Sequence, residues 1–211
     1  AGRAELNQGR GGLERTAVHR GVSQAERDAA YDNRAVAPRL GEMKDDWDRR
    51  SKALYASAKV ARDYAYGTGP RQRLDFFHAR SKGRPTLAFI HGGYWQWNEK
   101  EPNAFIVEGI LAHDVNVALV EYTLAPAATM SQIVAEIRSA IAWLVARLET
   151  ELGASPTLVV AGHSAGVHLA ATVAGLPGVT PRTPITGRFT LHPLRLRPLH
   201  SPVQLTHPNP R

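Results

Sequence analysis

The sequence predicts an α/β protein with a mostly parallel sheet that is flanked by helices on both faces. Short apolar segments end in glycine or polar residues, amphipathic segments of helical period separate them, and the two kinds alternate along the chain. Such alternation is typical of parallel strands, because each helical crossover returns the chain to the same edge of the sheet. The 211 residues are enough for one domain with a sizeable core.

The first segments lead into this core. Residues 1–40 are polar, rich in Arg and Gly, and weakly periodic, so we expect an irregular N-terminal arm. Residues 45–67 predict a helix, since Asp comes early, Lys and Arg come later, and Gly67 supplies a stop signal. Residues 73–79 predict a strand.

Three pairs of strand and helix follow, and they complete a predicted core over residues 41–175. Strands are expected at 84–93, 115–122 and 156–162, and helices at 103–113, 130–149 and 165–175. The second of these helices has the strongest pattern. Its predicted buried face consists of Ile133, Ile137, Ala140, Ile141, Leu144, Val145 and Leu148.

The C-terminal segment differs in composition from the core. Residues 176–211 hold eight of the 14 prolines and show no clear period, which predicts a loop-rich tail. Residues 165–211 contain five Arg and no acidic residue, so five of the seven surplus positive charges come from this end. The rest of the chain is nearly balanced and carries no RNA-binding signature, zinc-finger spacing or basic helix, so we expect no nucleic-acid partner.

The amino-acid composition also excludes several kinds of functional site. The absence of cysteine excludes disulfides, thiol nucleophiles and thiolate metal sites, and suits a cytoplasmic location. No apolar run is long enough to span a bilayer and no signal-peptide pattern opens the sequence, so we expect no membrane association. Without an H-E-x-x-H pattern or clustered carboxylates, we expect no metal site.

The segment GHSAG at 162–166 lies between a predicted strand and a predicted helix. A G-x-S-x-G string is common by itself, but a sharp strand-to-helix turn is the context in which it carries a nucleophile. Small residues at Gly162 and Gly166 let the strand and the helix approach each other, and the turn exposes the Ser164 hydroxyl. Ser164 is therefore the predicted catalytic nucleophile, in preference to an ordinary turn serine.

The segment HGGYW at 91–95 supplies a second element of the same chemistry. Acyl transfer places negative charge on a carbonyl oxygen, which backbone N–H groups must stabilise. Gly92 and Gly93, together with the N–H of Ala165, are the predicted oxyanion hole. We expect His91 to brace this loop by hydrogen bonding. Tyr94 and Trp95 either line a substrate pocket or pack the loop onto the sheet.

Three segments in this order, HGGYWQWNEKE, EYTLAP and GHSAGVHLAA, resemble the α/β-hydrolase superfamily, and in particular kynurenine formamidase (arylformamidase)-like esterases near the hormone-sensitive-lipase type. The resemblance covers roughly residues 30–175. It implies an α/β-hydrolase fold, hydrolysis of N-formylkynurenine or small carboxylic esters, and no cofactor. Ser164 matches the family nucleophile, and Gly92 and Gly93 match the family's oxyanion loop.

The sequence departs from this family after residue 175. Residues 185–199 resemble the family's next strand, with Thr190 where Asp is usual, and the 176–211 tail is interpreted as a remnant of that strand and the cap region. The C-terminal strands and helices of the fold are expected to be missing, and with them the triad Asp and His, neither of which is identified in this chain. His192, His200 and His207 follow the serine, but no later acid would orient them.

Two hypotheses follow from these patterns. The first is a serine hydrolase that acts on a small-molecule ester or amide, with its Asp and His supplied by further sequence or by a complementing chain. The alternative is a catalytically inactive hydrolase scaffold that serves as a binding or interaction module, since an open sheet edge favours a homo-oligomer or pairing with another chain.

Residues 1–211 alone are expected to be inactive, because without a base the serine hydroxyl stays protonated and is a weak nucleophile. We predict that they hydrolyse p-nitrophenyl acetate no faster than their Ser164→Ala variant, measured by release of nitrophenol. A Ser164-dependent burst would contradict this and would make one of the three late histidines the base.

Overall fold

The computed structural model describes residues 23–31, 39–176 and 179–180. The chain divides into two units, residues 1–46 and 47–211. The first unit contains helix α1 (Gln24–Tyr31) and the start of helix α3 (Leu40–Ser57). A capping box begins α1: Glu26 N–H donates to Ser23 Oγ, and Ser23 N–H donates back to the Glu26 carboxylate. The predicted irregular arm therefore includes a helix.

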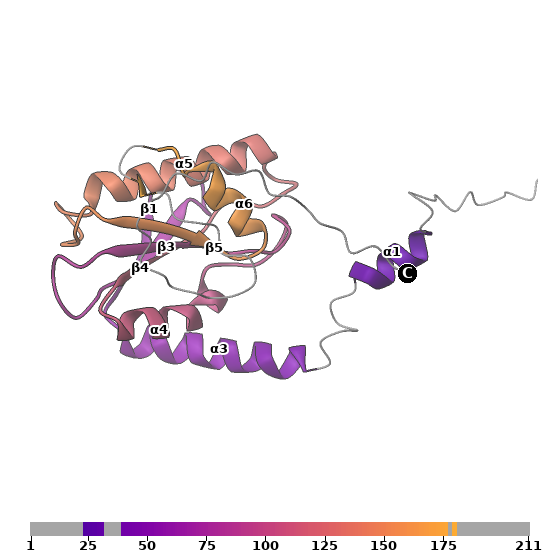
Figure 1. Ribbon diagram of the computed structural model, residues 1–211, viewed down its shortest axis with the longest axis horizontal. Coiled ribbons are helices and arrows are strands. Elements are labelled where there is room, and N and C mark those ends of the chain that lie inside the picture. Colours follow the sequence, from indigo (N-terminus) through magenta and orange to yellow (C-terminus); the bar gives the residue numbers. More distant parts are fainter. Residues whose placement is uncertain (1–22, 32–38, 177–178, 181–211) are drawn as a thin grey trace, which may run out of the picture. The chain divides into compact units, whose positions relative to one another are not determined.

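The second unit is built on a six-stranded sheet with the strand order β1-β2-β4-β3-β5-β6 (Figure 1). The strands are β1 (Val60–Ala65), β2 (Arg73–Phe77), β3 (Thr86–Ile90), β4 (Asn116–Val120), β5 (Leu158–Gly162) and β6 (Val179–Thr180). The first two strands run antiparallel to their neighbours, whereas β4, β3, β5 and β6 are parallel. The predicted α/β architecture with a mostly parallel sheet is confirmed.

The remaining helices connect these strands and cover both faces of the sheet. They are the 3-10 turn η1 (Glu101–Asn103), α4 (Phe105–Ala112), α5 (Met130–Arg147) and α6 (Ala165–Thr172). Helices α5 and α6 lie on one face, and α4 lies on the other beside the later turns of α3 (Figure 1). Alternate residues of β3 serve the two layers: Ala88 and Ile90 pack toward α5, and Leu87 and Phe89 pack toward α4.

Helix α5 confirms the strongest pattern in the sequence. Every residue of its predicted face is buried except Val145, which is partly buried. Thr129 caps its N-terminus in a capping box with Gln132. Burial of this apolar face against the sheet is a main source of stability for the layer above β3 and β4.

The predicted helix over 45–67 is wrong in its second half. Helix α3 begins at Leu40 and ends at Ser57, and residues 60–65 form β1, which pairs antiparallel with β2. Pairing of this short segment at the sheet edge overrides its helical pattern, because strand preference depends mostly on cross-strand packing.

The next strand after α6 in the described part of the chain is Val179–Thr180, which pairs with β5. The segment 185–199, which resembles the family's next strand in sequence, lies outside the described residues.

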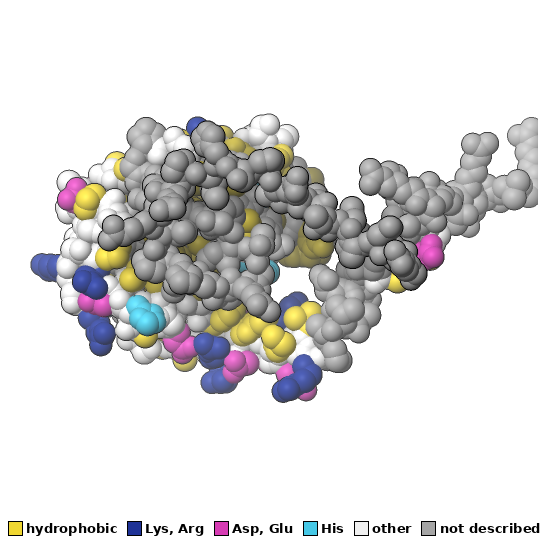
Figure 2. All heavy atoms as spheres, viewed as in Figure 1, with side chains coloured by type: hydrophobic (Ala, Val, Ile, Leu, Met, Phe, Trp, Pro, Cys, Tyr) yellow, Lys and Arg dark blue, Asp and Glu magenta, His cyan; other side chains and the backbone are white. Residues whose placement is uncertain are grey.

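The surface and the helices add two observations. Figure 2 shows acidic and basic side chains interspersed along the side of the molecule formed by α4 and the adjoining turns of α3, where Arg50 pairs with Glu108. Among the helices of the described residues, none combines the length and the apolar character needed to cross a bilayer.

The register of the parallel strands brings the predicted site residues to one edge of the sheet. Ile90 pairs with Val120 on one side and with Gly162 on the other. The residues that directly follow these three strands, His91, Glu121 and His163, therefore leave the sheet at the same carboxyl edge.

Candidate active site

Ser164 lies at a strained turn between β5 and α6. Its backbone has φ 53° and ψ −118°, a conformation that L-residues rarely adopt and that glycine favours. The His163 carbonyl accepts a hydrogen bond of 2.8 Å from Gly166 N–H, which closes the turn. The Ser164 side chain is exposed above the carboxyl edge of the sheet, as the nucleophile prediction requires.

The two glycines that flank Ser164 permit this turn. A Cβ atom on Gly162 would lie 2.3 Å from the carbonyl carbon and oxygen of Gly166. A Cβ atom on Gly166 would lie 2.0 Å from the carbonyl oxygen of Ile90, at the end of the neighbouring strand β3. Both contacts involve backbone atoms that cannot rotate away, so only glycine lets α6 approach β5 and β3 this closely.

The 91–100 loop, which follows β3, lies directly against this turn. A Cβ atom on Gly92 would be 2.7 Å from the His163 carbonyl oxygen and 3.0 Å from the Ser164 Cβ. Gly93 has φ 115° and accepts hydrogen bonds from the N–H groups of Gln96 and Trp97. Within the described residues, the N–H groups of Gly93 and Ala165 donate no hydrogen bond.

His91 is buried at the start of this loop, with 1% of its surface exposed. Its Nε2 lies 2.9 Å from Glu121 Oε1, and its Nδ1 lies 2.8 Å from the Gly92 carbonyl oxygen. The ring stacks on Tyr122 with centroids 4.4 Å apart, and the Tyr122 hydroxyl donates to the His91 carbonyl. The expected bracing of the loop by hydrogen bonds from His91 is confirmed.

Glu121 is a buried carboxylate that gathers four donors. Besides His91, it accepts hydrogen bonds from Arg71 Nη2 at 2.7 Å, Lys100 N–H at 2.9 Å and Tyr122 N–H at 3.0 Å. Burial raises the pKa of Glu121, but the hydrogen bond and charge of His91, the Tyr122 N–H and the Arg71 guanidinium more than offset it, so the pKa lies below its ordinary value. The group is therefore ionised at neutral pH.

Lys100 links this carboxylate to a second buried one. Its ammonium lies 3.3 Å from Asp75 Oδ2 and 2.9 Å from Asp63 Oδ1, and also pairs with Glu101. Asp75 accepts hydrogen bonds from the Tyr55 hydroxyl at 2.6 Å and from Asp63 N–H at 2.7 Å. Lys100, at the far end of the 91–100 loop, is thus held in two ways. Its backbone N–H binds Glu121, and its ammonium group binds Asp75 on β2.

The three aromatic residues of the loop have different surroundings. Trp95 is partly buried, packs against the core below α6 and meets the His168 ring edge-on at 5.5 Å. Its indole N–H has no hydrogen-bond partner among the described residues. Tyr94 and Trp97 are 47% and 60% exposed and contact each other edge-on. Trp95 therefore helps to pack the loop, while a pocket role for Tyr94 and Trp95 stays a prediction.

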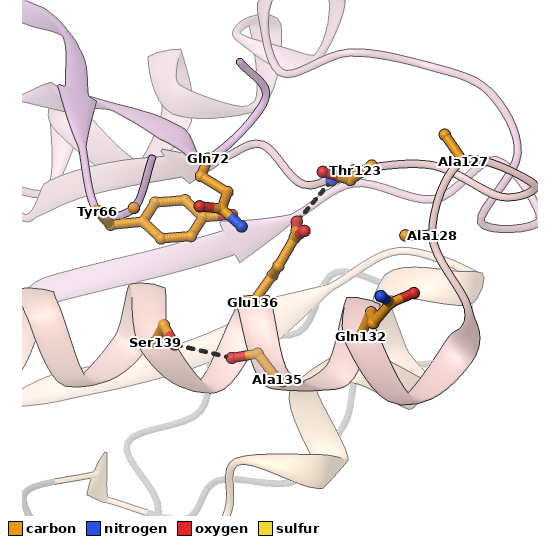
Figure 3. Close-up of a pocket in the computed structure, with 10 residues that line it drawn as sticks. Tyr66, Gln72, Thr123, Ala127, Ala128, Gln132, Ala135, Glu136 and Ser139 are labelled. Atoms are coloured by element: carbon orange, nitrogen blue, oxygen red, sulfur yellow. Dashed lines mark hydrogen bonds between the residues drawn. The ribbon is translucent and has the colours of Figure 1, made fainter. Parts of the chain in front are cut away.

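A separate cavity of about 380 Å³ lies at the same edge of the sheet, further from β5. Residues of the β1–β2 turn, of the segment after β4 and of α5 line it; they are Tyr66, Gly67, Gln72, Thr123, Ala127, Ala128, Gln132, Ala135, Glu136 and Ser139. Figure 3 shows Glu136 reaching from α5 to Thr123, whose N–H donates to its carboxylate at 2.8 Å. Neither Ser164 nor the glycine loop lines this cavity, so we do not assign it to the candidate active site.

The described residues supply no base and acid pair for Ser164. His163 and His168 are exposed, and no carboxylate contacts either of them in the described part of the chain. Thr190, His192, His200 and His207 lie outside the described residues. No group of three or more His, Asp or Glu that could hold a metal ion occurs in the described ranges.

Sequence reasoning missed Glu121, Arg71 and Lys100. The signal for Glu121 was an acidic residue directly after the apolar segment NVALV, at the carboxyl end of a buried strand. Three of its four partners come from 21 to 50 residues away, so the spacing along the chain does not reveal them.

Comparison with known proteins agrees with this geometry. A family model described as BD-FAE matches residues 74–181, more than half of the chain. The chain belongs to the BD-FAE family. The match runs from β2 to the end of β6 and includes both the 91–100 loop and the Ser164 turn.

Individual relatives of this BD-FAE chain are esterases and formamidases. It is 28% identical to kynurenine formamidase of Salmo salar over 159 residues, which are 71% of the chain and 53% of that enzyme. It is 34% identical to kynurenine formamidase of Drosophila melanogaster over 116 residues, which are 54% of the chain and 38% of that enzyme. The chain thus spans about half or less of the length of these curated relatives.

Solved structures confirm the fold. The hyperthermophilic esterase of the archaeon Pyrobaculum calidifontis matches with a TM-score of 0.53 and 25% identity, over 67% of the chain and 50% of the esterase. A protein of Silicibacter sp. TM1040, described as a candidate thioesterase, matches with a TM-score of 0.62 and 26% identity, over 72% of the chain and 56% of that protein. The α/β-hydrolase fold and the kinship with kynurenine formamidase-like esterases, both implied by the sequence resemblance, are confirmed.

Gly166→Ala is predicted to destabilise the BD-FAE chain by roughly 3 kcal/mol, because the added methyl group must push α6 away from the Ile90 carbonyl. The measurement is the free energy of unfolding in urea. Gly109→Ala in α4 is the matched control: nothing lies within 4 Å of its Cβ position, so we expect a gain of about 0.5–1 kcal/mol from helix propensity. Equal effects at the two positions would contradict the packing account.

Proposed function

We propose that this chain carries the nucleophile and the oxyanion hole of a serine hydrolase that cleaves carboxylic esters or aryl formamides through an acyl-enzyme. The observation that carries the proposal is the Ser164 turn, where an exposed hydroxyl is held in a strained backbone conformation beside N–H groups that bond to nothing else in the described residues. Strain of this kind persists where the surrounding structure imposes it, and it concentrates at functional sites.

The proposed reaction begins when Ser164 Oγ attacks the carbonyl carbon of the substrate while a base takes its proton. The tetrahedral oxyanion accepts hydrogen bonds from the N–H groups of Gly93 and Ala165, with Gly92 allowing the loop to approach the serine. The C–O or C–N bond to the leaving group then breaks as the base returns the proton to that group. The base then deprotonates a water molecule, which attacks the acyl carbon. The bond between this carbon and Ser164 Oγ breaks as the base returns the proton to Ser164.

The proposed base and its orienting acid come from outside the described residues, either from further sequence or from a complementing chain. This placement agrees with two observations: residues 165–211 contain no Asp or Glu, and the chain spans about half of the length of the formamidase of Salmo salar. The proposed site uses no metal and no organic cofactor, since the serine and the backbone donors supply the chemistry.

The proposed substrates follow from the relatives. Three of the similar proteins are kynurenine formamidases, and others are esterases. The loop places two exposed aromatic side chains, Tyr94 and Trp97, beside the glycines, where a planar aryl group of a substrate can stack. A small-molecule aryl formamide of the N-formylkynurenine kind, or an aryl ester, is the substrate class that we propose.

Labelling with a fluorophosphonate probe tests this proposal in the intact gene product. We predict labelling of wild type at Ser164, located by peptide mass, and loss of at least about 100-fold in the Ser164→Ala variant, because that variant lacks the hydroxyl beside the proposed oxyanion donors. Ser131→Ala, at another exposed serine on α5, is the control and should label as wild type does. Equal labelling of Ser164→Ala and wild type would refute the proposal.

A further inference from the structure

The ring of His91 lies between two oxygen atoms that can only accept hydrogen bonds. Its Nε2 faces the Glu121 carboxylate at 2.9 Å, and its Nδ1 faces the Gly92 carbonyl at 2.8 Å. The ring is buried and stacked on Tyr122, which shields both contacts from solvent. Both ring nitrogens of this one side chain therefore lie at hydrogen-bond distance from an oxygen atom.

A neutral imidazole cannot satisfy this arrangement. It carries one N–H and one lone pair, so either tautomer would place a lone pair against an oxygen atom at hydrogen-bond distance. The imidazolium ion has two N–H donors and makes both bonds attractive. The nearby carboxylate compensates the buried positive charge, as a buried ion requires.

The groups around the ring agree with this assignment. From the segment directly after β4, Glu121 supplies the negative charge and the Tyr122 ring covers one face. From the β1–β2 turn, Arg71 shares Glu121 Oε1 at 2.7 Å, which opposes a second cation but also helps to keep the carboxylate ionised. The Lys100 ammonium is held by Asp63, Asp75 and Glu101 instead. On the other side of Gly92, the nearest titratable group is the exposed ring of His163.

This ion pair bears directly on the oxyanion loop. The Gly92 carbonyl and the Gly93 N–H belong to one peptide unit, so a cation bound to the carbonyl oxygen polarises the unit and makes the N–H a stronger donor. Glu121 also holds the loop at both ends, through the His91 ring and through the Lys100 N–H. Glu121 therefore both positions the 91–100 loop and stabilises the positive charge of the His91 ring beside the Gly92 carbonyl.

We propose that Glu121 holds His91 as an imidazolium ion, and that this ion pair positions the 91–100 loop and strengthens the Gly93 N–H as a donor to the oxyanion. Glu121 and His91 are positioning residues in this account, since neither reaches the reacting atoms. The catalytic part of the inference rests on the proposed function, whereas the protonation of His91 does not.

The protonation state is measured by NMR of the 211-residue chain with ¹⁵N-labelled histidine. The chain has nine histidines, and the His91 signals are assigned by their loss in His91→Gln. At a pH slightly above neutrality, where exposed histidines are neutral, we expect both ring nitrogens of His91 to carry protons. A His91 ring with only one protonated nitrogen in wild type would overturn the proposal.

Two variants separate the Glu121 ion pair from a general effect of removing a buried carboxylate. Glu121→Gln should convert His91 to a single neutral tautomer and increase amide exchange within residues 91–100. Asp75→Asn removes the other buried carboxylate, which contacts Lys100 but not His91, and should leave the His91 signals as they are in wild type. A doubly protonated His91 in folded Glu121→Gln would also overturn the proposal, and if that variant does not fold, the wild-type spectrum decides.

Kinetics of the intact gene product test the catalytic part. We expect Glu121→Gln to lower kcat by about tenfold or more and to change KM by less than about twofold, because a weakened oxyanion donor acts in the transition state rather than in substrate binding. An unchanged kcat would refute the polarising role. If Ser164→Ala turns over substrate as fast as wild type, the proposed function fails, while the NMR result still decides the protonation of His91.

Discussion

The close approach of three backbone segments around Gly166 is the constraint on which the rest of the site depends. Helix α6 can begin beside the ends of β5 and β3 only because Gly162 and Gly166 have no side chains. The chain must then reverse direction within one residue, and this forces Ser164 to φ 53°. The same crowding draws Gly92 against the Ser164 Cβ, so the nucleophile turn and the oxyanion loop are positioned by one set of contacts.

The charged side chains near this turn are also brought together by the sheet. The parallel register of β3, β4 and β5 delivers His91, Glu121 and the Ser164 turn to one edge of the sheet. Buried carboxylates are costly unless they are paired, and both Glu121 and Asp75 are surrounded by donors, which come from the 91–100 loop, the β1–β2 hairpin and, for Asp75, also α3. The loop that carries the predicted oxyanion donors is thus held by ionic contacts at its far end and by backbone contacts at Gly92.

The sequence predicts most of the α/β core, because its signals are local. Residues 130–149 show an unambiguous helical period, and the G-x-S-x-G segment lies where a strand meets a helix. The strand over 60–65 could not be separated from the helix before it, since its residues complete the charge pattern of α3 and its pairing with β2 is a tertiary effect. Helix α1 was missed for a different reason: it has only eight residues and few large apolar side chains, so it lacks the apolar face by which core helices are recognised.

The candidate site could be predicted only where one short segment carries the chemistry. Ser164, Gly92 and Gly93 stand in recognisable motifs, whereas the role of Glu121 depends on Arg71 and Lys100, which the sheet register brings to it. The triad partners of Ser164 remain a prediction about residues outside the described part of the chain. The fold, in contrast, follows from the whole pattern of strands and helices, and the family resemblance follows from three short segments; the BD-FAE match over residues 74–181 agrees with both.

The measurement that tests the central claim most directly compares the stability of Ser164→Gly and Ser164→Ala. If packing forces residue 164 into a conformation that only glycine adopts without strain, glycine should relieve that strain, whereas alanine should keep it. Urea unfolding should then show Ser164→Gly to be more stable than Ser164→Ala by about 1 kcal/mol, even though glycine has the more flexible unfolded chain. A Ser164→Gly variant that is equally or less stable than Ser164→Ala would contradict the account.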